Sequence, residues 1–308
     1  MHLGNLLIAL LSWLDARAAG GAFVLRIEDL DPDRCRPAYA EQLADDLRWL
    51  GLDWDEGYQC ADGESFCQSN RSACYEAVWR QFYNAGKLYP CYCTRAELIS
   101  VAAPHAGERS PVYDGRCREL TPEAVRRFEG AGRKPAWRIR VPDKMVSFTD
   151  GHCGFFGQNL ARECGDFVIR RADHVYTYQL AVSVDDAAMQ VTRVVRGRDL
   201  LDSTPRQIWL MREMRQTPPQ YFHAPLLLAR DGRRLSKRDR DVDMSVFRQR
   251  CVPEQVIGFL AALSGLLTRP EACAPRDLLP LFSWERVPQN DIVLPDTAFL
   301  FPDVKKFY

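Results

Sequence analysis

The sequence predicts an α/β fold, and two features of the chain indicate it. Short, largely apolar runs that suit buried strands alternate with helical patterns, in which apolar residues recur every three or four positions. The chain has 308 residues, of which 46% are hydrophobic, so it can bury a sizeable core in one large domain or two smaller ones. This hydrophobic content and the formal net charge of +0 exclude a disordered chain.

The first 85 residues contain three helical patterns and one strand-like run. Glycine follows each helical pattern and marks its end. The second helix is expected to bury Tyr39, Leu43, Leu47 and Leu50 on one side. We therefore expect a helix over 6–18, a strand over 22–27, and helices over 37–50 and 71–85.

Residues 88–150 differ in character from the rest, and we expect them to form a small subdomain inserted into the core. They contain a pair of cysteines, a loop rich in Pro, His and Gly, and a short helix that begins at Thr121 and Pro122. Alternating patterns at 137–141 and 146–148 predict strands. After the insert we expect strands over 166–171 and 191–195, and helices over 205–214 and 253–267.

These elements divide the chain into four expected parts. The core is split in two by the insert, and a helical extension follows it. The parts are a first half of the core at 1–87, the insert at 88–150, a second half of the core at 151–240 and a C-terminal extension at 241–308.

Charge is distributed unevenly along the chain. Residues 1–68 hold 5 basic and 13 acidic groups, whereas residues 193–240 hold 12 basic and 5 acidic groups. The basic segment suits a polyanion such as nucleotide or RNA phosphate, although a solvated basic face is the alternative. No apolar run reaches the roughly 18 residues of a membrane span, and no signal peptide is recognisable, so we expect a cytoplasmic protein with no membrane partner.

The cysteines include a possible metal-binding pair. Most of the eleven are expected to be buried thiols, because a cytoplasmic chain keeps its cysteines reduced. Cys91 and Cys93 are separated by one residue, which suits one metal ion better than a disulfide, and Cys117 lies within reach as a third ligand. The spacing leaves the fourth ligand open among three residues: His105, Asp114 and the chemically less usual Tyr113.

Two motifs suit the binding of phosphate. His2, Gly4 and Asn5 stand at a helix start, where unpaired backbone N–H groups attract an anion, although an ordinary N-terminal helix explains this motif better when it is taken alone. The basic loop at 233–238 contains Lys237, which can neutralise charge on a transferring phosphate. A plain surface charge run is the alternative for that loop.

Two further motifs suit the binding of an amino acid. Glu28 follows a strand, at the end where ligands bind in open α/β sheets, and its carboxylate can hold an ammonium group. Arg196 follows another strand, and a guanidinium can clamp a carboxylate in two parallel hydrogen bonds. The alternatives are a solvated acidic turn for Glu28 and a structural ion pair for Arg196.

In this order, the motifs resemble the class I aminoacyl-tRNA synthetases of the glutamyl and glutaminyl group. His2-Leu-Gly-Asn5 resembles the His-x-Gly-His signature, and Leu-Ser-Lys-Arg at 235–238 resembles the Lys-Met-Ser-Lys-Ser signature. Arg-Ile-Glu-Asp-Leu-Asp at 26–31 resembles a block of the same group, and Tyr178 and Arg196 fall where the group binds glutamate.

Within the group the sequence resembles the glutamyl-Q tRNA(Asp) synthetases, which lack an anticodon-binding domain. The chain ends about seventy residues after the lysine loop, so we expect no such domain. The spacing Cys91-x-Cys93 and Tyr113-x-x-x-Cys117 is the pattern of that subfamily. The resemblance therefore implies a structural Zn²⁺ with Tyr113 as its fourth ligand.

The resemblance also implies a fold and a two-step reaction. The fold is a Rossmann-like class I catalytic core with a parallel sheet, an inserted zinc-binding subdomain and a helical C-terminal portion. ATP, with Mg²⁺, activates L-glutamate to glutamyl-adenylate without tRNA, and the glutamyl group then passes to the queuosine base at the wobble position of tRNA(Asp). We expect a monomer.

The resemblance assigns roles to named residues. His2 and Lys237 are the expected catalytic residues, and ATP is expected to contact these two together with Gly4, Asn5 and Ser236. Glutamate is expected to place its ammonium group at Glu28 and its side-chain carboxylate at Arg196, with Tyr178 lining the pocket.

The sequence departs from the group at its start. The group has a strand and loop before the His-x-Gly-His signature, whereas this sequence begins at Met1-His2. We interpret this as a start placed downstream of the true one. The alternatives are a truncated, inactive paralogue that binds RNA or a partner, and a short glutamyl-tRNA synthetase.

Overall fold

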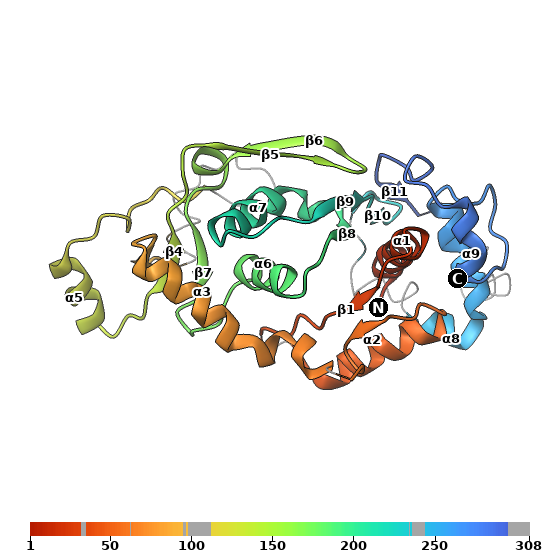
Figure 1. Cartoon of the computed structure of the whole chain (residues 1–308), viewed down its shortest axis with the longest axis horizontal. Helices are drawn as coiled ribbons and strands as arrows, with labels where there is room; N and C mark the ends of the chain where they lie inside the picture. Colours follow the sequence, from red (N-terminus) through yellow and green to blue (C-terminus); the bar gives the residue numbers. More distant parts are fainter. Residues whose placement is uncertain are drawn as a thin grey trace.

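The computed structural model describes residues 1–31, 35–61, 63–94, 97, 112–233, 235 and 244–294. Helices and strands alternate along it, with α6 and α7 near the centre, α5 at one end and α9 at the other (Figure 1). The helices are α1 (Leu3–Ala18), α2 (Pro37–Trp49), α3 (Ser72–Asn84), α5 (Pro122–Gly130), α6 (Tyr178–Ala188), α7 (Thr204–Glu213), α8 (Met244–Arg250) and α9 (Pro253–Leu263).

The described strands form small sheets of both kinds. Parallel pairs join β1 to β2, β8 to β9, and β10 to β11, whereas β3, β4 and β7 form an antiparallel sheet and β5 and β6 a hairpin. The strands are β1 (Val24–Leu25), β2 (Glu56–Gly57), β3 (Leu88–Cys91), β4 (Ala136–Ile139), β5 (Met145–Asp150), β6 (Gly154–Asn159), β7 (Phe167–Arg170), β8 (Arg193–Gly197), β9 (Gln220–Ala224), β10 (Leu227–Leu228) and β11 (Ile292–Val293).

The parallel sheet expected from the sequence is present in the described residues as separate pairs rather than as one continuous sheet. The pair that matters for the site is β8–β9, which α7 connects in a βαβ unit, as parallel strands require. Its register places Arg196 opposite His223. The register of this pair therefore fixes which side chain lies beside the guanidinium.

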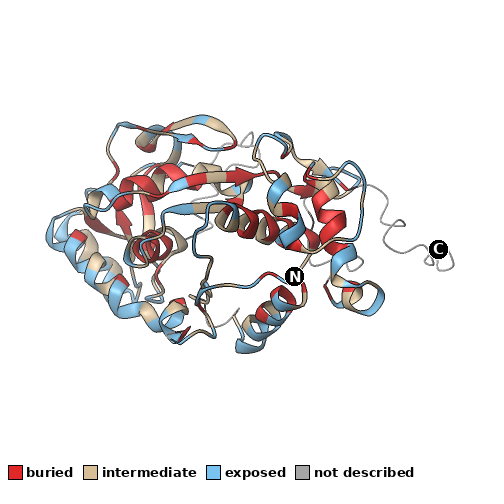
Figure 2. Ribbon diagram, turned by 45° about the vertical axis from the view of Figure 1, so that its right-hand side comes forward, coloured by how far each residue is buried: buried red, intermediate tan, exposed pale blue. Residues whose placement is uncertain are grey.

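Two large apolar clusters hold the elements together. The first surrounds α1, whose buried leucines recur at helical spacing, and includes residues of α2 and α9. The second packs α3, α6 and α7 against β4 and β7. Figure 2 shows buried residues concentrated on the interior strands and helices, whereas α5 has none.

The predicted helices over 6–18, 37–50, 71–85 and 205–214 are confirmed within a few residues, and the helix expected over 253–267 ends earlier, at Leu263. The expected burial of Tyr39 is wrong, because its side chain is 57% exposed, whereas Leu47 and Leu50 are buried as expected, together with Ala44. Strand pairing crosses residue 150, the expected end of the insert, because β5 ends there and pairs with β6. Strand β7 also lies beyond that residue and completes the sheet of β3 and β4. Within the described residues, no helix combines the length and the hydropathy that a bilayer span requires.

Candidate active site

A pair of carboxylates surrounds Arg26 at the end of β1. Nη1 of Arg26 donates to Asp186 Oδ1 at 2.7 Å, and Nη2 donates to Glu28 Oε1 at 3.0 Å. Burial raises the pKa of the Asp186 carboxyl, and the charge and hydrogen bond of Arg26 act against this rise. With both carboxylates ionised the group carries one net negative charge, which suits an ammonium group.

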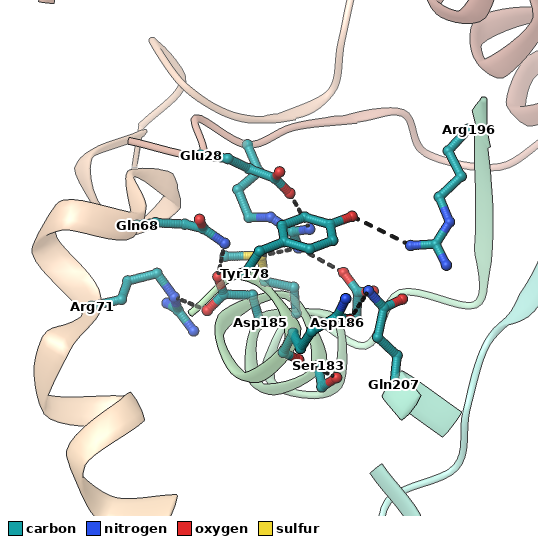
Figure 3. Close-up of polar contacts among 12 residues, drawn as sticks. Glu28, Gln68, Arg71, Tyr178, Ser183, Asp185, Asp186, Arg196 and Gln207 are labelled. Carbon is teal, nitrogen blue, oxygen red and sulfur yellow. Dashed lines mark hydrogen bonds and ion pairs between the residues drawn. The ribbon is translucent and has the colours of Figure 1, made fainter. Parts of the chain in front are cut away.

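Tyr178, the first residue of α6, lies between these carboxylates and Arg196 (Figure 3). Its hydroxyl is 3.4 Å from Arg196 Nη1. Burial raises the pKa of the Tyr178 phenol; the charge of Arg196 lowers it and that of Glu28 raises it further. The structure thus brings together three residues that are far apart in the sequence and that we expected at one glutamate site.

Arg196 is a buried cation with neutral partners. Its side chain is 7% exposed, with Nε donating to His223 Nε2 at 3.1 Å and Nη2 to Thr204 Oγ1 at 2.7 Å. Among the described residues, no carboxylate forms an ion pair with it, unlike Arg26. Buried charges in proteins are normally paired, so the missing anion is most simply supplied by a ligand. This geometry disfavours the structural ion pair that the sequence had left open.

His2, Gly4 and Asn5 lie at the start of α1. His2 Nδ1 accepts a hydrogen bond from the Gly4 N–H at 3.1 Å, and Asn5 Oδ1 accepts one from the His2 N–H at 3.4 Å. Because Nδ1 accepts, the neutral ring carries its proton on Nε2 and can donate it to a phosphate oxygen. Asn5 serves this cap, a use that the sequence did not suggest.

Helix α1 links the residues at its start, His2, Gly4 and Asn5, to Arg196, because it packs along β8. The hydroxyl of Ser12 lies 3.3 Å from the carbonyl oxygen of Val195, the residue before Arg196. The helix that begins at His2 therefore runs beside the strand that carries the guanidinium. Ser236 and Lys237, expected at the phosphates, lie outside the described residues.

Three thiols meet beside the β3–β4–β7 sheet. The Sγ atoms of Cys91, Cys93 and Cys117 lie within 4.8 Å of one another, and those of Cys93 and Cys117 are 3.6 Å apart. Thiolates 2.3 Å from one tetrahedral zinc ion would stand about 3.8 Å apart, so the donor set fits zinc. Tyr113 directs its hydroxyl toward the cluster, 3.6 Å from Cys91 Sγ.

Electrostatics favour an ionised Cys91. Burial opposes ionisation of this thiol, but Arg138 donates a hydrogen bond to its Sγ at 3.2 Å and outweighs burial, so its pKa lies below the usual value. Burial and the neighbouring Cys91 raise the pKa of Cys93 to about 12, which a bound cation would reverse. Of the other candidate ligands, Asp114 is bound to Arg116, and His105 lies outside the described residues.

The sequence did not predict the residues that contact the expected site residues, or the partners of those residues, inside the fold. Asp186 and its neighbour Asp185 are consecutive acidic residues in an otherwise apolar helix, a signal that was available but carried no assigned role. Thr204, His223 and Asp150 gave no comparable signal, because only the tertiary fold brings them to Arg196 or to its partner His223.

The fold and the site together define an α/β protein in which Tyr178 lies between a pair of carboxylates and a buried guanidinium. Residues 1–272 match the family model described as "tRNA synthetases class I (E and Q), catalytic domain". The chain belongs to this family, which confirms the resemblance seen in its motifs.

Similar proteins extend over nearly the whole chain. It is 49% identical over 300 residues to a protein of Symbiobacterium thermophilum and 47% identical over 301 residues to one of Nitratidesulfovibrio vulgaris, both named Glutamyl-Q tRNA(Asp) synthetase; each match covers 96% of this chain and 92% of the relative. The crystal structure of a glutamate-tRNA synthetase from Elizabethkingia anophelis is similar with a TM-score of 0.80 and 26% identity, over 96% of this chain and 66% of that one. This chain thus spans just under two thirds of that structure.

Proposed function

We propose that this protein activates L-glutamate with ATP and transfers the glutamyl group to the queuosine base at the wobble position of tRNA(Asp). The names of the most similar curated relatives support the substrate pair. The observation that carries the assignment of glutamate is Arg196, whose buried guanidinium has neutral partners in the described part of the chain. A side-chain carboxylate supplies the anion that this cation lacks.

The proposed pose of glutamate follows from the charges of the site. The ammonium group lies at the Arg26–Glu28–Asp186 group, whose net charge is negative, and the side-chain carboxylate lies at Arg196. Tyr178 lies between these two groups. Glutamine in this pose leaves the guanidinium with an amide that matches it poorly, so the site rejects it.

Activation then needs no general base, because the α-carboxylate is ionised at neutral pH. One of its oxygens attacks the α-phosphorus of ATP, the bond to pyrophosphate breaks, and the mixed anhydride glutamyl-adenylate forms. His2 is proposed to donate its Nε2–H to a phosphate oxygen at the start of α1, and Gly4 allows close approach of the nucleotide. Ser236 and Lys237 are proposed to neutralise the leaving pyrophosphate, and Mg²⁺ binds as the ATP complex.

Glutamate-dependent exchange of pyrophosphate into ATP tests the first step. We expect exchange with L-glutamate in the absence of tRNA and none with L-glutamine. Absence of exchange with any amino acid favours the inactive paralogue. In the second step, queuosine-containing tRNA(Asp) is expected to accept glutamate, whereas acceptance by tRNA(Glu) alone identifies a short glutamyl-tRNA synthetase.

We further propose that Cys91, Cys93, Cys117 and Tyr113 hold a structural zinc ion within the 88–150 insert, and that the protein works as a monomer. Zinc would join β3 to the segment before α5. The apolar cluster at this place consists of only four buried residues, so we expect the bonds to zinc to contribute most of its stability.

Substitution of one thiol tests the zinc site. The purified protein is expected to contain about one zinc ion per chain, and Cys117→Ser is expected to lose it and to unfold at a lower temperature, because ligand loss removes folding free energy. Elemental analysis and thermal unfolding measure both effects. Cys74→Ser is the matched control, since Cys74 is exposed and outside the cluster. Full zinc content in Cys117→Ser would contradict the site.

A further inference from the structure

A buried polar chain lies behind Arg196. His223 on β9 is fully buried, and its two ring nitrogens face two different groups. Nδ1 is 2.6 Å from Oδ2 of Asp150, the last residue of β5, and Nε2 is 3.1 Å from Nε of Arg196. The chain therefore runs from Asp150 through the imidazole to the guanidinium that faces the candidate site.

The proton positions along this chain are fixed by Asp150. Its Oδ1 accepts backbone N–H groups of His152, Cys153 and His223 at 2.8–3.1 Å. Burial opposes ionisation of Asp150, but these bonds and the His223 ring outweigh it and lower its pKa. The carboxylate thus accepts only, and Nδ1 of His223 must carry the ring proton.

The other ring nitrogen is then an acceptor. Burial lowers the pKa of His223, so the ring is neutral and Nε2 has a lone pair for the Nε–H of Arg196. Thr204 Oγ1 takes the neighbouring Nη2–H at 2.7 Å. These two contacts occupy the Nε–Nη2 edge of the guanidinium. The Nη1–Nη2 edge, beside the Tyr178 hydroxyl, remains the one that can hold a carboxylate in two parallel bonds.

We propose that Asp150 and His223 are positioning residues, which fix the tautomer of the imidazole and thereby turn the Nη1–Nη2 edge of Arg196 toward the side-chain carboxylate of the substrate. The identity of that substrate rests on the proposed function, whereas the tautomer relay does not. Neither residue touches the substrate. Their effect is therefore expected in glutamate affinity and in discrimination against glutamine, rather than in the use of ATP.

Asp150→Asn tests the relay with almost no change in shape. The asparagine keeps its oxygen on the three backbone N–H groups and places its NH₂ group against Nδ1, so the ring proton moves to Nε2. Nε2–H then faces the Nε–H of Arg196 and has only Thr204 Oγ1, 3.1 Å away, as an acceptor; the Nε–H is left without one, and the guanidinium turns away. We expect the KM for glutamate in pyrophosphate exchange to rise roughly 10- to 100-fold, as when a ligand group loses its orienting partner. The KM for ATP is expected to stay within about twofold.

A second variant separates positioning from damage to the fold. Glutamine at position 223 places an amide oxygen near the site of Nε2, and this acceptor does not depend on a tautomer. Asp150→Asn combined with His223→Gln is therefore expected to recover most of the glutamate affinity that Asp150→Asn loses. Asp143→Asn is the matched control, because Asp143 is exposed, lies close to the same hairpin and binds only Asn159 and Arg162 among the residues described. The proposal would be overturned if Asp150→Asn lowered the amount of active protein but left the KM for glutamate unchanged, and if the double variant recovered nothing.

A spectroscopic measurement tests the relay independently of activity. In ¹⁵N NMR spectra of protein with ¹⁵N-labelled histidine, one of the five histidines is expected to show a protonated Nδ1 and an unprotonated Nε2. The signals of this ring are expected to be absent from the spectrum of His223→Gln. Asp150→Asn is expected to reverse the two signals. An unchanged tautomer refutes the relay even if exchange occurs, whereas a reversed tautomer without glutamate-dependent exchange in the wild type refutes the proposed function and leaves the relay intact.

Discussion

Arg196→Gln is expected to reduce kcat/KM for glutamate in pyrophosphate exchange by roughly 30- to 5,000-fold, the equivalent of about 2–5 kcal/mol for one partner of a buried charge pair. The neutral amide cannot compensate the substrate carboxylate, and the site that excludes water from Arg196 excludes it from the carboxylate as well. The KM for ATP is expected to change little, because no described contact joins this side chain to the start of α1. Steady-state exchange at varied glutamate and ATP concentrations measures both.

The same substitution is expected to leave the free energy of unfolding unchanged or to increase it. In the absence of substrate Arg196 is a desolvated charge with neutral partners, and replacement of such a charge by a neutral side chain removes a cost. Urea denaturation measures the effect. Arg162→Gln is the control for both assays, since that guanidinium is 73% exposed and pairs with Asp143. A large loss of stability in Arg196→Gln would mark this arginine as structural and would contradict the site.

Arg196 and Arg26 differ in their charge balance, and this difference supports the proposal that glutamate is the ligand. Both guanidinium groups are largely buried near Tyr178, but Arg26 has two carboxylates and Arg196 has none among the described residues. The first group carries a net negative charge when both of its carboxylates are ionised, whereas no carboxylate of the described residues lies within ion-pair distance of the second. A zwitterion with an additional side-chain carboxylate matches both, which neither an uncharged side chain nor a second ammonium group does.

The sequence predicted the local elements and the residues that face the candidate ligand, but not the residues behind them. Helical periodicity with a terminal glycine located α1, α2 and α3, since these signals act within one turn. Glu28 and Arg196 were expected because each follows a strand. Asp150 and His223, in contrast, are separated by 73 residues, and their contact depends on the register of the end of β5 against β9, where the Gly151 N–H donates to the carbonyl oxygen of Tyr221. No local pattern encodes such a register.

The helix that carries Tyr178 was missed for a related reason. Residues 178–188 are buried on almost all sides, so α6 lacks the polar face that reveals an amphipathic helix. Its two aspartates appeared as an interruption of an apolar run. In the structure they are the anchors of the helix: Asp186 binds Arg26, and Asp185 binds the segment that enters α3.

Asp185→Ala is expected to be the most destabilising single substitution that we consider, at about 3–5 kcal/mol in the free energy of unfolding. The Asp185 carboxylate is fully buried and accepts three side-chain hydrogen bonds: from Gln68 at 2.7 Å, from Arg71 at 2.6 Å and from the Tyr75 hydroxyl at 2.9 Å. Alanine leaves a nearly buried guanidinium without its counter-charge, in addition to two unsatisfied donors. Urea denaturation measures the loss, and Asp173→Asn, which alters an exposed partner of Arg171, is the control.

Asp185→Asn distinguishes the contribution of charge from that of shape. The amide fills the same volume and still accepts one or two of the three hydrogen bonds, but its NH₂ group faces a donor and the charge of Arg71 is unbalanced. We expect a loss smaller than that of alanine but well above that of the exposed control. Because Tyr178 and Asp186 lie on the same helix, the fraction of active sites is expected to fall together with stability, while the KM for glutamate of the remaining folded protein stays constant. An altered KM at full stability would instead assign Asp185 to the pocket itself.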